Sequence, residues 1–481
     1  MFVALDRASS TPLAVQVAAG MRAAALDGRL RAGDRVPATR TLARDLGVSR
    51  TVAAAAYDQL VAEGWLGARH GSGTFVLAAP PSPPVSTAAM LTPGGTDAPT
   101  TTDLRPGAPC LEVLDPASWR RAWRRVGDLV PSERPEYAGV PAFREAIAEH
   151  LLRHRGLVGA DVLATAGTTT GFAEIVAVLT RRLGRPVRAG IEDPGYRRAA
   201  GVLRAAGAEV TGLAVDADGL VVGNAPSGLD LVYVTPAHQY PLGGRLPMTR
   251  RAALVERARS EGFLVVEDDY DGELRYDVAP LPVLAALAPD VVVHLGTAGK
   301  IATPTLGVGW LVAPPALTAD LLALRAATGT RPAPAGQLVF AAWVHDGGLG
   351  RHLTRLRREL AVRRSLVVDA VRAAGHEVLG DRAGAHLVVP LGSAAAERAA
   401  VDAAAEVGVR VDGLAQHRLD DVESLPLDLT ADSTEHADRA LLSRPQVHGI
   451  LVGWAAPTRA ELEHALTRLG GVLAGTGVTP A

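Results

Sequence analysis

The segment Leu295-Gly-Thr-Ala-Gly-Lys300 ends an apolar, β-branched stretch and contains the only lysine of the 481-residue chain. The other 48 of its 49 Lys and Arg residues are arginines. Arginine replaces lysine readily on a solvated surface, but not in covalent amine chemistry, because the guanidinium stays protonated. Two interpretations of Lys300 follow. It is a Schiff-base residue whose amine is made nucleophilic by a lowered pKa, or it is a surface lysine left by chance.

Apolar segments like the one before Lys300 recur through the chain after residue 103, with helical stretches between them. They cover residues 162–165, 187–191, 209–213, 231–234, 263–266, 291–295 and 308–312. Such alternation predicts an α/β fold with a mainly parallel sheet covered by helices. Ligands of these folds bind at the carboxyl ends of the strands.

Length and composition limit the class of protein. A chain of 481 residues with 48% hydrophobic and 21% charged residues predicts two or three globular domains. Cys110 is the only cysteine, which excludes an internal disulfide and favours the cytoplasm. The first residues lack the pattern of a signal peptide, and no apolar run reaches the roughly 20 residues of a membrane span. We therefore expect a cytoplasmic protein without a membrane partner.

The first 78 residues are mildly basic, with nine arginines against six acidic residues. A helical pattern begins at Thr11-Pro12, and a short helix ends at Leu46 before Gly47 turns the chain. Ser49 is placed as the N-cap of a further helix that extends to about Glu63. Two short apolar segments then flank the glycines of residues 69–73, which predicts a hairpin.

This region resembles the winged helix-turn-helix domain of GntR-type regulators. The resemblance rests on Gly33-Asp-Arg-Val-Pro37, Leu46-Gly-Val-Ser-Arg50, Ala62-Glu-Gly64 and Gly71-Ser-Gly-Thr-Phe75, which follow the family's order and spacing. It implies binding to double-stranded operator DNA, with a homodimer on paired half-sites. The implied DNA contacts are Ser49, Arg50 and Thr51 in the major groove, Arg40 on the backbone, and Arg69, His70, Gly71, Ser72 and Gly73 in the wing.

Residues 79–102 contain six prolines and a single charge, Asp97, which is the composition of a linker. The sequence thus predicts a DNA-binding domain at 1–78, a Pro-rich linker at 79–102 and a third region at 103–481. Within that region we expect a large part at about 136–340 and a small part formed by about 103–135 and 341–481.

Two motifs lie at predicted strand ends in the third region. Gly167, Thr168 and Thr169 precede a helix, where backbone amides and hydroxyls suit a phosphate. This motif alone favours the alternative, which is ordinary helix capping. After the strand at 263–266, Asp268 and Tyr270 can place a carboxylate and a phenol on the same side. A carboxylate keeps a pyridinium nitrogen protonated, and a phenol can hold a ring oxygen. The alternative for this acidic cluster is a solvated turn.

Together these motifs resemble fold type I aminotransferases, which bind pyridoxal phosphate (PLP), and the whole chain resembles the MocR subfamily of GntR-type regulators. Further matches are Glu192-Asp-Pro-Gly-Tyr196, Thr235-Pro-Ala-His-Gln-Tyr-Pro241 and Glu267-Asp-Asp-Tyr-Asp271. The resemblance implies that Lys300 forms the Schiff base, Asp268 pairs with the pyridine nitrogen, Tyr270 lies near the 3-oxygen and Tyr196 lies beside the ring, while Gly167, Thr168, Thr169 and Thr297 hold the phosphate.

The chain departs from the family at three places. Gly299 replaces a common serine, and Gly307 stands where an arginine usually faces the phosphate, so a different arginine such as Arg245 would have to substitute. Residues 447–453 lack the arginine that often binds a ligand carboxylate. Arg198 remains a candidate for binding an effector.

The leading hypothesis is a transcriptional regulator whose aminotransferase-like body senses PLP or a PLP–ligand adduct. One alternative is a PLP-dependent aminotransferase with a DNA-binding appendage, and another is a regulator that has lost PLP. No metal is expected.

Overall fold

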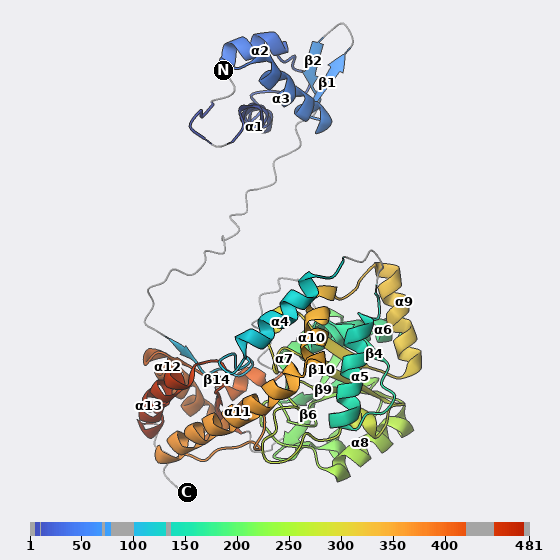
Figure 1. Cartoon of the computed structure of the whole chain (residues 1–481), viewed down its shortest axis with the longest axis vertical. Coiled ribbons are helices and arrows are strands. Elements are labelled where there is room, and N and C mark those ends of the chain that lie inside the picture. Colours follow the sequence, from blue (N-terminus) through green and yellow to red (C-terminus); the bar gives the residue numbers. More distant parts are fainter. Residues whose placement is uncertain are drawn as a thin grey trace. The chain divides into compact units, whose positions relative to one another are not determined.

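The computed structural model describes residues 5–9, 11–69, 73–77, 101–130, 136–419 and 447–475. The chain divides into two compact units, Met1–Asp97 and Ala98–Ala481, which we call the head and the body (Figure 1). Among the described residues, no helix is long and apolar enough to cross a membrane.

The head is a helix-turn-helix followed by a hairpin. Its elements are α1 (Leu13–Leu26), α2 (Thr39–Leu46), α3 (Arg50–Ala62), β1 (Leu66–Arg69) and β2 (Gly73–Val76). Gly47 makes the turn between α2 and α3 with a φ of 63°, a conformation that favours glycine. Ser49 caps α3 by accepting a hydrogen bond from the amide of Val52 at 3.2 Å, so the predicted N-cap is confirmed.

The body is built on an eight-stranded sheet with the order β4-β11-β10-β9-β8-β5-β6-β7. Strands β10, β9, β8, β5 and β6 run parallel to their neighbours within this group, whereas β11 and β7 pair antiparallel. The predicted α/β fold with a mainly parallel sheet is confirmed. The strands are β4 (Val162–Thr165), β5 (Arg188–Asp193), β6 (Glu209–Asp216), β7 (Gly219–Leu220), β8 (Leu231–Val234), β9 (Leu264–Asp269), β10 (Val292–Thr297) and β11 (Gly309–Val312).

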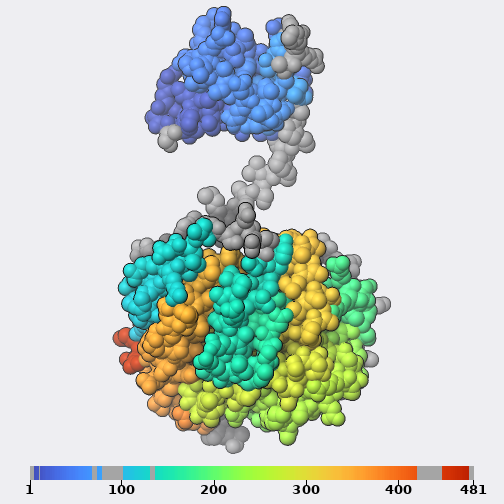
Figure 2. All heavy atoms as spheres, turned by 45° about the vertical axis from the view of Figure 1, so that its right-hand side comes forward, coloured from blue at the N-terminus to red at the C-terminus, as the bar shows by residue number. Residues whose placement is uncertain are grey.

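Helices cover both faces of this sheet, because alternate strand residues point to opposite sides. Val232 and Val234 belong to the core cluster that contains residues of α5, α8 and α10, whereas Tyr233 belongs to the cluster with α6, α7 and α9. Figure 2 shows part of the outer layer, with α5 in teal. The helices are α5 (Pro141–Arg155), α6 (Thr168–Leu183), α7 (Arg197–Ala205), α8 (Met248–Glu261), α9 (Pro315–Thr328) and α10 (Pro334–His345).

A second, three-stranded sheet with the order β12-β15-β14 completes the body. Its strands are β12 (His386–Leu391), β14 (Asp412–Gly413) and β15 (His448–Gly453), accompanied by α4 (Pro116–Gly127), α11 (Gly348–Ala373), α12 (Ala394–Glu406) and α13 (Arg459–Gly475). Thr102, the last residue of the predicted linker, instead belongs to β3 (Thr102–Asp103), which pairs with β13 (Val409–Arg410). Residues 78–100 lie outside the described residues, and the other domain boundaries stay predictions.

The structure corrects the predicted end of one strand. The sequence places Glu267, Asp268 and Asp269 after a strand that ends at residue 266, but β9 continues through Asp269 and all three carboxylates are buried. Acidic residues are rarely buried without partners, so the pattern suggested a turn. Between β9 and β10 lies only the short 3-10 helix η2 (Leu284–Ala286), where the sequence predicted a full helix.

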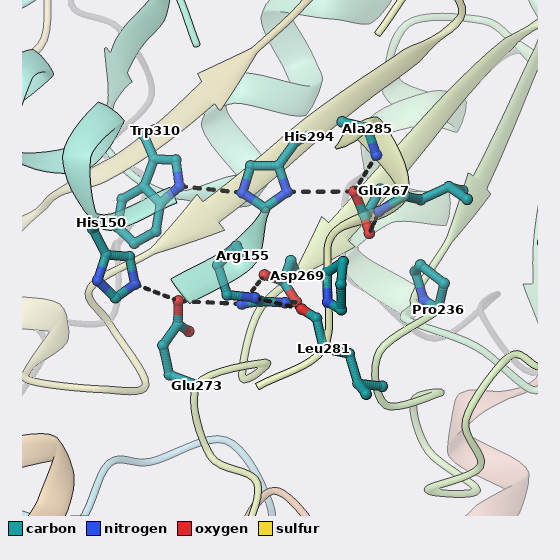
Figure 3. A network of polar contacts seen from close by, with 12 residues as sticks. His150, Arg155, Pro236, Glu267, Asp269, Glu273, Leu281, Ala285, His294 and Trp310 are labelled. Atoms are coloured by element: carbon teal, nitrogen blue, oxygen red, sulfur yellow. Dashed lines mark hydrogen bonds and ion pairs between the residues drawn. The ribbon is translucent and has the colours of Figure 1, made fainter. Parts of the chain in front are cut away.

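A buried network of charges supports the end of β9 (Figure 3). The guanidinium of Arg155 donates to Asp269 at 2.9 Å, to Glu273 at 3.3 Å and to the carbonyl of Leu281 at 2.8 Å. Glu273 also contacts Nε2 of His150 at 3.1 Å. Arg155 is fully buried, so it neutralises carboxylates that have no access to water.

Replacing Arg155 with Met should destabilise the body by about 3 to 5 kcal/mol, because two buried carboxylates lose their cation. Chemical denaturation followed by circular dichroism measures the effect. Arg153→Met is the matched control two residues earlier on α5, where the side chain is 68% exposed and forms an ion pair with Glu149. That variant should lose less than about 1 kcal/mol. Equal losses in the two variants would contradict the stabilising role of Arg155.

Candidate functional site

A pocket of about 480 Å³ lies at the carboxyl ends of the central strands. Its lining includes every residue that the sequence analysis assigned to the cofactor, and also Arg198. These residues are Gly167, Thr168, Thr169, Tyr196, Arg198, Asp268, Tyr270, Thr297 and Lys300. The structure therefore brings together residues separated by more than a hundred positions, while their individual roles stay predictions.

Asp268 lines the pocket, and one oxygen of its carboxylate has no hydrogen-bond partner among the described residues. Its Oδ2 accepts a hydrogen bond from the hydroxyl of Tyr233, whereas Oδ1 is buried and has no hydrogen-bond partner among the described residues. Burial raises the pKa of Asp268 to about 7, and the neighbouring charge of Asp269 adds to the effect of burial. A cationic N–H group placed at Oδ1 would satisfy this oxygen and stabilise its charge.

Lys300 follows the end of β10, and its side chain enters the same pocket. Its Nζ donates a hydrogen bond to the carbonyl of Gly107. Burial lowers the pKa of Lys300 below its ordinary value, while the carboxylates of Asp271 and Asp268 oppose part of this shift. A lowered pKa increases the fraction of neutral, nucleophilic amine, as the Schiff-base interpretation requires.

The first turn of α6 forms a cup of backbone amides at the pocket. Gly167 is the N-cap of this helix and supplies no side-chain hydrogen bond to the free amides. The hydroxyl of Thr169 lies 3.2 Å from that of Tyr196, and the hydroxyl of Thr297 accepts a hydrogen bond from the amide of Gly299 at 3.0 Å. Free amides at a helix N-terminus suit an anion such as a phosphate.

Neither Gly307 nor the candidate substitute Arg245 supplies a cation to this cup. Gly307 ends the 3-10 helix η3 (Pro304–Leu306) with a φ of 59°, and it does not line the pocket. Arg245 lies 3.7 Å from Asp381 and also lies outside the pocket lining, so it does not substitute. The cations that line the pocket are Arg197, Arg198 and Lys300.

Tyr270 is held by a buried histidine. Its hydroxyl donates to the carbonyl of His238 at 3.1 Å and also lies 3.1 Å from Nδ1 of His238, which contacts Asp271 at 2.8 Å. His238, Asp271 and His386 place potential metal-ligand atoms within 4.8 Å of one another. One nitrogen of each ring already has a partner, Asp271 for His238 and the carbonyl of Pro241 for His386. We interpret this cluster as support for Tyr270.

Sequence reasoning missed the partner of Asp268 and several residues that line the pocket. Tyr233, the buried partner of Asp268, does not line the pocket itself; it is on β8, whose register places it beside Val266 of β9. An aromatic residue in a strand adjacent to the acidic segment was the only available signal. Tyr240, His386, Asp412 and His417 line the pocket, and the last three come from the second sheet and its connections. Nothing in the sequence indicated which part of that sheet faces Lys300.

The described candidate DNA contacts of the head lie on α2, at the start of α3 and in the hairpin. Arg40, Ser49, Arg50 and Thr51 are all exposed, at the start of α2 and around the start of α3. His70, Gly71 and Ser72 lie outside the described residues, and the side chain of Arg69 is likewise not described. Gly73 begins β2, opposite Arg69 in the hairpin register.

Comparisons with known proteins match both units. Residues 13–76 match the family model described as bacterial regulatory proteins of the gntR family, and residues 115–441 match aminotransferase class I and II. The pyridoxine biosynthesis transcriptional regulator PdxR of Corynebacterium glutamicum is 37% identical over 77% of this chain and 81% of its own length. The chain belongs to the MocR-type GntR regulators.

Two further comparisons each cover more than three quarters of this MocR-type regulator. The probable rhizopine catabolism regulatory protein MocR of Rhizobium meliloti is 33% identical, over 76% of this chain and 79% of its own. Among solved structures, the kynurenine aminotransferase of Pyrococcus horikoshii superposes with a TM-score of 0.66 at 20% identity, over 78% of this chain and 91% of that one. At that identity the likeness shows the fold alone. The regulator thus combines a DNA-binding head with an aminotransferase-like body.

The raised pKa of Asp268 predicts a pH-dependent stability. The folded body retains a proton on Asp268 that the unfolded chain releases between about pH 4 and pH 7, so the free energy of unfolding falls as pH rises through this range. Asp268→Asn removes this contribution, and the loss of stability from pH 5 to pH 7 should be smaller in the variant by about 1 to 3 kcal/mol. Urea denaturation at several pH values measures it. Parallel profiles for wild type and variant would refute the prediction.

Proposed function

We propose that the body binds PLP through Lys300, and that PLP or a PLP–ligand adduct controls how the head binds operator DNA. The observation that carries the proposal is that a half-buried lysine and a buried carboxylate line the same pocket. The only lysine of the chain has a lowered pKa, and Asp268 has an unpaired, buried oxygen. A ligand with a pyridine nitrogen and an aldehyde requires both groups, a carboxylate facing the nitrogen and an amine that reacts with the aldehyde.

Each part of this cofactor has residues of the pocket that suit it. When bound, PLP supplies an aldehyde that condenses with an amine. Asp268 would hold the proton on the ring nitrogen, and Tyr270 would face the 3-oxygen. Tyr196 would lie beside the ring, and the phosphate would be held by Gly167, Thr168, Thr169 and Thr297. Arg198 would bind an anionic group of an effector.

The glycine at position 307 suggests that PLP binds reversibly. Without an arginine at position 307, the phosphate loses a charge-assisted hydrogen bond that is typically worth about 1.5 to 3 kcal/mol. A cofactor that is held less firmly can dissociate when its concentration falls, which suits a sensor better than an enzyme. The Corynebacterium relative is named as a regulator of pyridoxine biosynthesis, which supports PLP as the signal.

Titration with PLP tests the proposal. The full-length protein should develop a visible absorbance band that borohydride makes permanent. Lys300→Ala and Lys300→Arg should both stay colourless, and the second keeps the positive charge, so it isolates the need for an amine. A wild-type protein that stays colourless with excess PLP would sink the proposal. Steady production of a keto acid from an amino donor, without DNA binding, would favour an aminotransferase instead.

For the head, we propose that a homodimer places two α3 helices in successive major grooves of an operator. Arg50→Ala should weaken binding to DNA selected by the wild-type protein from a random pool by about 1 to 3 kcal/mol, if the side chain contacts a base. Fluorescence anisotropy measures the affinity. Arg44→Ala is the control, since Arg44 is 80% exposed at the other end of α2. Unchanged affinity for Arg50→Ala would remove Arg50 from the interface.

A further inference from the structure

Two side chains of the pocket have no part in the proposed cofactor chemistry. Asp412 comes from β14 and His417 from the 3-10 helix η4 (Leu414–His417), and both line the pocket. Oδ2 of Asp412 and Nε2 of His417 lie 3.9 Å apart. The two elements are consecutive in the chain, so the local backbone holds the carboxylate and the imidazole beside each other.

The imidazole of His417 lacks a protein partner. The residue is only 7% exposed, and neither ring nitrogen has a hydrogen-bond partner among the described residues. Buried polar groups are normally hydrogen-bonded, and leaving one unsatisfied is unfavourable. Because His417 lines the pocket, a bound ligand can supply the missing hydrogen bond.

Both groups are hydrogen-bond acceptors near neutral pH. Burial, together with the charge of Arg197, lowers the pKa of His417 to about 4, so one ring nitrogen keeps its lone pair. The pKa of Asp412 is raised overall, because the effect of burial outweighs the charges of Arg105 and Arg197, which lower it. Arg105 is held by both carboxylate oxygens of Asp103, and neither arginine forms an ion pair with Asp412.

The surroundings of this pair suit a cation. Tyr240 packs edge-on against His417 with ring centroids 5.1 Å apart, and Tyr196 packs against Tyr240 at 6.0 Å. Aromatic rings attract ammonium groups. Arg197 also lines the pocket but is exposed, so solvent and salt screen its repulsion of a second cation.

We propose that Asp412 and His417 form a subsite for the ammonium group of a small-molecule effector. The subsite then selects an amine whose far end is cationic over one whose far end is a carboxylate, and an anionic group bound by Arg198 would lie elsewhere on the effector. This inference rests on the effector-sensing function proposed above. An ammonium has three N–H donors, of which Asp412 and His417 accept two. In the pairing of β14 with β15, Asp412 lies opposite Leu451, and residues 447–453 include no lysine or arginine that would bind a carboxylate.

Two probes of matched length test the subsite. 1,4-Diaminobutane and 4-aminobutyrate share an amine and a four-carbon chain, but their far ends carry opposite charges. Isothermal titration calorimetry on the full-length protein, with and without PLP, should show that the diamine binds at least about tenfold more tightly, which is the effect expected of one charge-assisted hydrogen bond.

Variants assign the preference to the two residues. Asp412→Asn keeps the shape of the side chain and should weaken diamine binding about 10- to 150-fold without weakening 4-aminobutyrate binding. His417→Leu should weaken diamine binding about 2- to 10-fold, since it removes a neutral acceptor. Asp402→Asn is the control, because Asp402 is exposed on α12 and lies outside the pocket lining.

Equal affinities for the two probes, or a preference for 4-aminobutyrate, would overturn the inference. So would diamine binding that persists in a folded Asp412→Asn protein, as verified by thermal unfolding, because the amine would then bind elsewhere. The titrations without PLP separate this inference from the cofactor proposal. A diamine preference in a protein that never binds PLP would support the subsite and reject the cofactor.

Discussion

Three consecutive carboxylates, Glu267, Asp268 and Asp269, are buried at the end of the central strand β9, and the body is organised around compensating them. Buried charges are stable only with partners. Glu267 accepts hydrogen bonds from the amides of Leu284 and Ala285 and lies 3.4 Å from His294. Asp269 has Arg155. Only Asp268 is left incompletely paired, with Tyr233 on one oxygen.

This incomplete pairing explains why the pocket lies where it does. The partners of Glu267 and Asp269 are Arg155 of α5, the amides of η2 and His294 of the neighbouring strand β10, and Figure 3 shows them side by side. Residues of α5 and η2 belong to the core cluster that also contains α8 and α10. Side chains alternate along a strand, so Asp268 points to the opposite side from its neighbours. There it meets Lys300 and the start of α6 at one pocket. A single strand thus directs one carboxylate to the pocket and its two neighbours to supporting contacts.

The same fold serves enzymes among the solved structures and a regulator here, and the difference lies in individual side chains. The pocket of this body holds Lys300 and Asp268 together with an acid–imidazole pair at Asp412 and His417, and glycine stands at position 307. On our proposals, the glycine weakens the binding of a phosphate. The acid–imidazole pair, on the same basis, selects the charge of the ligand that the pocket accommodates. Both features would affect which molecule the pocket binds and with what affinity, and a sensor depends on both.

The sequence by itself determined the two-part architecture, the helix-turn-helix with Ser49 as its cap, and most strands of the large sheet, because these depend on local periodicity and capping. It also singled out Lys300, Asp268 and Tyr270, because rare residue types stood in recognisable motifs. Only the tertiary structure decided that β9 extends through three buried carboxylates, since their partners Arg155, His294 and Tyr233 come from distant segments. It alone placed Asp412 and His417 at the pocket, because the packing of the second sheet against the first leaves no trace in local sequence patterns.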